Sequence, residues 1–175
     1  MRQGDIVFLQ GKSLISKAVR FFDKGTFSHV AIAMSETHIL EADFDTRVSI
    51  VPLDKKQYNI IEVIDLGLNQ EERSRIVDMG TKMVGKKYDY MQIIWYILDK
   101  LLGLKGKNRL NNPNNYICSE LVFVVLEEAG ILEELTLKSG SRGIDMTPNQ
   151  LYDFIKYISS KQLSKAKNRQ SHSVR

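Results

Sequence analysis

Two residues of this sequence have the chemistry of a nucleophilic site: the single cysteine and a histidine in a strand-like segment. Cys118 lies in the stretch NNYICSELVF, where a polar segment meets an apolar run of helical character. A thiol at the start of a helix becomes a thiolate easily, because the positive end of the helix dipole favours the anion. Free cysteines are also among the most buried residue types, so the position fits a core residue as well as a nucleophile.

His29 lies in the segment SHVAIAM, whose composition predicts a strand. Alternation along this strand puts two alanines on the face of His29, so small side chains leave room beside the imidazole. If residues 35–37 form a three-residue hairpin loop, Asp43 lies directly opposite His29 and Glu41 lies diagonally across. Either carboxylate can then orient the imidazole, and the hairpin geometry alone favours Asp43.

A thiol, an imidazole and a carboxylate are the groups that a cysteine hydrolase needs. The thiolate attacks a carbonyl carbon, the histidine holds and returns the proton, and the acid fixes the histidine tautomer. A histidine beside a carboxylate is also a common structural pair, so a structural role stays open at this point. The other histidines, His38 and His172, do not have metal-ligand spacing with the cysteine, and no phosphate-binding loop occurs. We therefore expect no metal site and no cofactor.

The elements that must position these groups follow from hydrophobic periodicity and capping signals. Strands are predicted where short apolar runs lie between turn residues, at 4–9, 28–35, 38–44, 47–53 and 58–66. Helices are predicted where apolar residues recur at helical spacing, at 13–22, 69–85, 89–104, 118–130 and 147–158. Asn69 with Glu72, and Thr147 with Gln150, have the spacing of capping boxes. This order predicts an α+β domain whose mostly antiparallel sheet packs against helices.

Length and composition indicate one globular domain with a basic end. The 175 residues are 43% hydrophobic and 26% charged, enough for a sizeable core. The net charge of +4 comes from the last 17 residues, which hold five basic residues and no acid; elsewhere 20 basic residues balance 21 acidic ones. We expect one folded domain at 1–160, which would be the hydrolase domain, and a basic, disordered tail at 161–175. We expect no nucleic-acid partner.

Targeting signals are not found in the sequence. The N-terminal MRQGDIVFLQ lacks the layout of a signal peptide, and the longest apolar stretch, MQIIWYILDKLLGL, is interrupted by charges and too short to span a bilayer. We therefore expect a cytoplasmic protein. The helix at 89–104, which contains Trp95, could touch a membrane surface, although covering the sheet is the more common role for such a helix.

Several of these segments together resemble the circularly permuted papain-like proteins of the NlpC superfamily, in particular the YiiX-like branch. The resemblance is carried, in order over residues 3–156, by GDIVFL, SHVAIAM with HILEA, KKYDY, YICSELVFVVLEEAG and TPNQLYDF. In this family the histidine strand precedes the cysteine helix, as it does here. The resemblance implies a permuted papain-like fold with Cys118 at a helix N-terminus as nucleophile, His29 as its partner, and Glu41 rather than Asp43 as the third residue.

The resemblance also implies a reaction: a cysteine peptidase or amidase that cleaves amide bonds through a thioester, on small peptides of the cell-wall type, in a bacterial or phage setting. The backbone N–H of Cys118 is one expected oxyanion donor, and Tyr88 and Tyr116 are candidates for a second. Lecithin:retinol acyltransferase-like proteins share the permuted core, so acyl transfer or lipid hydrolysis is the alternative reaction. A non-catalytic binding module is the third hypothesis, which the complete set of cysteine, histidine and glutamate disfavours.

Overall fold

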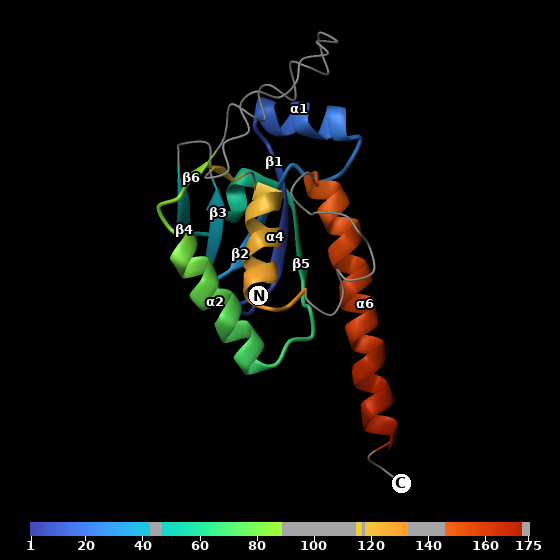
Figure 1. Ribbon diagram of the computed structural model, residues 1–175. Coiled ribbons are helices and arrows are strands. Elements are labelled where there is room, and N and C mark those ends of the chain that lie inside the picture. Colours follow the sequence, from blue (N-terminus) through green and yellow to red (C-terminus); the bar gives the residue numbers. More distant parts are fainter. Residues whose placement is uncertain (43–46, 89–114, 117, 133–145, 173–175) are drawn as a thin grey trace.

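The computed structural model describes residues 1–42, 47–88, 115–116, 118–132 and 146–172 (Figure 1). For 87–88, 115–116 and 161–172 only the backbone is described. Its main sheet has the strand order β4-β3-β2-β1-β5, and every neighbouring pair is antiparallel. The strands are β1 (Ile6–Gly11), β2 (His29–Ala33), β3 (His38–Ala42), β4 (Val48–Pro52) and β5 (Tyr58–Ile64). A separate parallel pair joins β6 (Lys87–Tyr88) to β7 (Asn115–Tyr116). The antiparallel sheet predicted from the sequence is confirmed.

The described helices are α1 (Leu14–Asp23), α2 (Gln70–Met83), α4 (Cys118–Glu128) and α6 (Pro148–His172), and a short 3-10 turn, η1 (Lys55–Gln57), precedes β5. Three of the four described helices, α2, α4 and α6, contribute to the core on one face of this sheet. Figure 1 shows α4 and α2 over one face of the sheet, α6 beside β5, and α1 across the end where α4 begins. Both predicted capping boxes form: Asn69 with Glu72 at the start of α2, and Thr147 with Gln150 at the start of α6. None of these helices is long and apolar enough to cross a bilayer.

The central strands of the sheet are buried on both faces, so the two faces of β2 can be told apart by the residues they contact. Val30 and Ile32 belong to the main core, which includes residues of α2, α4 and α6. Ala31 and Ala33 belong to a smaller cluster with residues of β1 and β3 on the other face. The alternation expected for the histidine strand is therefore present.

The C-terminal helix differs from its prediction. The sequence predicted a helix at 147–158 and a disordered tail at 161–175, whereas α6 continues as a helix to His172 and extends past the rest of the described chain (Figure 1). Apolar periodicity ends near 158, but lysine, glutamine, alanine and arginine are good helix formers, so the backbone can continue without a packed face. That this segment adds nothing to the stability of the domain stays a prediction. The helix predicted at 89–104 lies outside the described residues.

Candidate active site

His29 and Cys118 are the first residues of their elements, and this brings them together at one end of the sheet. The helix α4 packs along β2, and the side chain of Cys118 lies close enough to the imidazole of His29 to raise its pKa. Cys118 is only 4% exposed, whereas the side chain of His29 is 19% exposed. The thiol is therefore shielded from water, and the imidazole keeps a partly open side.

The carboxylate that contacts His29 is Glu41. The Nε2 atom of His29 lies 2.9 Å from Oε2 of Glu41, which is buried in β3. The register is the expected one, with Ile32 opposite Leu40 and a three-residue hairpin loop. A diagonal neighbour lies farther away than a direct one but is still within reach of a long side chain, so the extra carbon of glutamate makes the contact possible. The alternative acid, Asp43, lies outside the described residues.

The surroundings of His29 keep it protonated. Burial by itself disfavours the charged imidazolium, but hydrogen bonds with Cys118 and Glu41 and the negative charges of these two groups outweigh it and raise the pKa of His29 from 6.5 to about 10. The imidazolium therefore persists across the neutral range, between a carboxylate and the sulfur. A thiol, an imidazolium and a carboxylate in this order are the groups that a cysteine hydrolase uses.

Two of the expected oxyanion donors lie at or just before Cys118 in the chain, and the third, Tyr88, pairs with one of them. The N–H groups in the first turn of a helix have no acceptor within the helix, and Cys118 is the first residue of α4. Tyr88 and Tyr116 face each other in the β6–β7 ladder, and Tyr116 is two residues before Cys118. The backbones of both tyrosines thus meet just ahead of the nucleophile candidate, and a role for their side chains stays a prediction.

Two polar side chains with no role predicted from the sequence hold the elements of the pair in place. Ser119 donates a hydrogen bond to the carbonyl of Met146, and Asn149 bonds to both backbone groups of Phe27. Asn149 and Phe27 are 122 residues apart in the chain. Local spacing carries no signal for contacts of this kind, although both polar residues lie in segments that carry the family resemblance.

The chain is similar to known proteins. A family model described as a permuted papain-like amidase enzyme, YaeF/YiiX, C92 family, matches residues 1–168. This chain belongs to the C92 family of permuted papain-like amidases. A similar solved structure is titled metalloprotein yiiX from Escherichia coli O157:H7, with 20% identity and a TM-score of 0.49 over 87% of this chain and 92% of that chain. No curated protein matches the chain.

Membership in the C92 family confirms the predicted fold and the predicted enzyme class. A C92 protein is a cysteine peptidase or amidase with a permuted papain-like domain, and in this chain the histidine strand precedes the cysteine helix, as the permutation requires. The roles of Cys118, His29 and Glu41, and the wider NlpC grouping, stay predictions. In the part of the chain that the structure describes, no group of three or more potential metal-ligating side chains occurs.

Proposed function

We propose that this C92 protein hydrolyses amide bonds through a thioester on Cys118. His29 carries the proton, and Glu41 orients His29. The observation that supports these roles is the position of the imidazole of His29, which is near the side chain of Cys118 and has its Nε2 2.9 Å from Oε2 of Glu41. Nucleophile, base and orienting acid in this order are the arrangement that thiol hydrolases use.

The resting state is a thiolate on Cys118 beside an imidazolium on His29. The sulfur attacks the carbonyl carbon of the amide, and the backbone N–H of Cys118 helps to bind the oxyanion that forms. When the tetrahedral intermediate collapses, the C–N bond breaks, the amine takes the proton of His29 and a thioester remains. Neutral His29 then accepts a proton from water as it attacks the thioester, which releases the acid and restores the ion pair.

Glu41 acts on the imidazole rather than on the substrate. Its carboxylate accepts the hydrogen bond of Nε2–H, which fixes the tautomer and leaves Nδ1 to serve Cys118. The same carboxylate raises the pKa of His29, so it also stabilises the imidazolium of the resting state. The substrate class, small peptides of the cell-wall type, is supported by the family resemblance rather than by a feature of the site.

Intact-protein mass spectrometry tests this proposal. The protein is incubated with muropeptides and, separately, with phospholipid vesicles, and is quenched in acid during the first turnovers. We expect the mass of a peptide acyl group on the wild-type chain in the first sample, and no added mass on Cys118→Ala. An adduct only with phospholipids would assign lipid acyl chemistry instead. A folded protein with neither adduct nor product from either substrate would contradict the thioester mechanism.

A further inference from the structure

We propose that the first turn of α6 is a bridge that sets the distance between the two members of the catalytic pair, with Asn149 and Ser119 as positioning residues. The inference rests on the proposed function, because it assigns these residues a role relative to Cys118 and His29. Neither residue contacts the reacting atoms. Each acts through a neighbour of one catalytic residue.

On the histidine side, Asn149 holds the backbone two residues before His29. The N–H of Phe27 donates to Oδ1 of Asn149, and Nδ2 of Asn149 donates to the carbonyl of Phe27, both at 2.9 Å. Nδ2 also donates to the carboxylate of Asp23, the last residue of α1. Both N–H bonds of the amide and its oxygen are therefore engaged, which leaves the side chain one orientation.

The chain that leads into β2 also lies unusually close to this amide. A Cβ atom on Gly25 would lie 2.1 Å from Cγ of Asn149, so only glycine allows the approach without a shift. The ring of Phe27 is buried and lies 4.8 Å from that of Tyr152, one turn farther along α6. The start of the histidine strand is thus fixed against α6 by hydrogen bonds and by packing.

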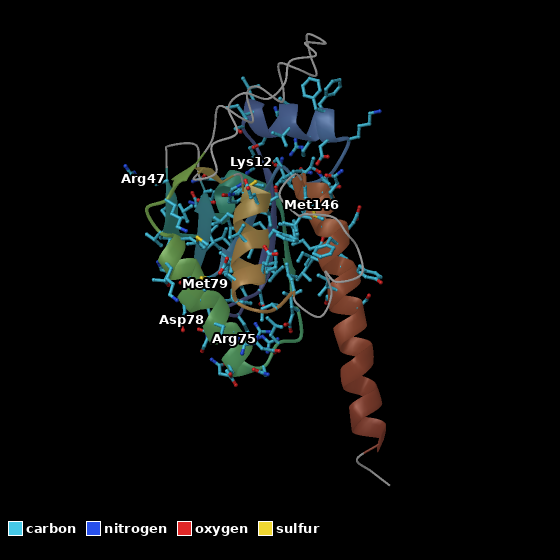
Figure 2. All side chains as sticks on the ribbon, viewed as in Figure 1. Lys12, Arg47, Arg75, Asp78, Met79 and Met146 are labelled. Carbon is cyan, nitrogen blue, oxygen red and sulfur yellow. The ribbon has the colours of Figure 1, made fainter. Side chains whose placement is uncertain are left out.

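On the cysteine side, the contact comes from Ser119, the residue after Cys118. Its side chain is fully buried, and its hydroxyl donates to the carbonyl of Met146, which lies just before α6 (Figure 2). The next residues form the capping box, in which the N–H of Gln150 donates to Oγ1 of Thr147 at 3.2 Å and the N–H of Thr147 donates to Oε1 of Gln150 at 2.9 Å. The turn between Met146 and Asn149 is therefore held as one unit.

The consequence is a single rigid turn that contacts both halves of the site. His29 and Cys118 come from different elements. The ladder of β2 with β1 includes His29, opposite Leu9, whereas the ladder with β3 ends at Ile32–Leu40, so the sheet holds His29 on one side only. A misplacement of about 1 Å at reacting atoms can cost about 100-fold in rate. Hydrogen bonds to Phe27, two residues before His29, and from Ser119, the residue after Cys118, are well placed to prevent such a misplacement.

The alternative is that these hydrogen bonds only stabilise the fold, and Ser159 provides the matched control. Its hydroxyl donates to the carbonyl of Asp65 at 2.8 Å. Ser159 is buried, as Ser119 is, and lies on α6, as Asn149 does. This contact lies several turns along α6 from the site. A variant of Ser159 should thus lower stability without changing the catalytic pair.

The test is the rate of Cys118 alkylation by iodoacetate as a function of pH, with thermal unfolding measured on the same samples. Asn149→Ala and Ser119→Ala should each slow alkylation at pH 6 by about 10- to 100-fold and shift the profile toward that of His29→Ala. Ser159→Ala should stay within about twofold of wild type at the same loss of thermal stability. Folded variants at 149 and 119 that match Ser159→Ala would overturn the inference.

A double variant tests whether the two tethers share one bridge. Either substitution alone already releases one side of the pair. The alkylation rate of the double variant Asn149→Ala/Ser119→Ala should therefore lie within about threefold of the rate of the slower single variant. Effects that multiply would contradict a shared bridge. Gly25→Ala, which keeps Asn149 but forces its amide aside, should slow alkylation in the same direction, and a wild-type rate in this variant would also count against the bridge.

The same data separate failure of the inference from failure of the proposed function. If wild-type Cys118 does not react at pH 6, or if His29→Ala reacts like wild type, the proposed catalytic pair is wrong. The inference about the bridge is then wrong as well. If the wild-type reaction is fast and depends on His29, but the bridge variants match it, only the inference is wrong.

Discussion

Removing the charge of Glu41 should lower the pH above which the enzyme loses activity, which we call the alkaline limit. In the proposed mechanism the enzyme loses activity on the alkaline side when His29 loses its proton, near pH 10. The hydrogen bond from Nε2 and the charge of Glu41 both raise this pKa. A raised pKa means that the proton is held to higher pH, so a variant without the carboxylate must release it at lower pH.

The size of the shift follows from the contact. A hydrogen bond to a charged group contributes about 1.5–3 kcal/mol, and one pKa unit corresponds to about 1.4 kcal/mol, so loss of the whole interaction lowers the pKa of His29 by about 1–2 units. Glu41 is only 7% exposed, so solvent screens the interaction little. Glu41→Gln keeps an acceptor and should shift the limit by about 1 unit, whereas Glu41→Ala should shift it by about 2 units.

The assay is the pH dependence of kcat/KM on a small amide substrate between about pH 6 and pH 11. Besides the shift, Glu41→Gln should lower turnover by about 100-fold or more at neutral pH, because the orienting acid is lost. Circular dichroism must show that the variant is folded. The reasoning is refuted if Glu41→Gln leaves the limit near pH 10 with only a mild loss of turnover. If Asp43→Asn is instead the damaging change, the direct hairpin neighbour is the orienting acid.

Two further predictions concern parts of the chain away from the pair. Deletion of residues 161–175 should change the melting temperature by no more than about 2 °C and leave hydrolysis of a small substrate unchanged, because the segment has few apolar residues to bury. A large drop of the melting temperature would show that the segment packs on the domain. Arg73→Leu should lower the free energy of unfolding by about 3–5 kcal/mol in urea titrations, because buried Arg73 donates to the buried carboxylate of Asp5 and also to Asp65. Its Cys118 alkylation profile should match wild type under native conditions, and a loss below about 1 kcal/mol would contradict this account of Arg73.

Much of the architecture near the site could be predicted because its signals are local. The alternation in SHVAIAM set the two faces of β2, and the short loop at 35–37 set the register with β3. The capping box of Asn69 and Glu72 marked the start of α2 to the residue. Each of these features depends on residues within a few positions of one another, which is the range that periodicity and capping rules cover.

The remaining features depend on side-chain reach and on long-range contacts. Hairpin register alone favoured Asp43, but whether a diagonal glutamate contacts His29 depends on the length of its side chain, which register does not describe. The contacts of Asn149 with Phe27 and of Ser119 with Met146 join segments far apart in sequence. The end of α6 was missed for another reason: the prediction followed apolar periodicity, which stops near 158, while the helix continues on intrinsic propensity.

The central claim, a Cys118 thiolate paired with His29, is tested most directly by carboxymethylation with iodoacetate across pH. The chain has one cysteine, so the modified residue is known. An ordinary thiol has a pKa of about 8.5 and is almost fully protonated at pH 6, where it reacts slowly. We predict rapid reaction of the native protein at pH 6, and a shift of the profile to higher pH in His29→Ala. Slow reaction at every pH until denaturant is added, with no effect of His29→Ala, would contradict the account and make Cys118 a core residue.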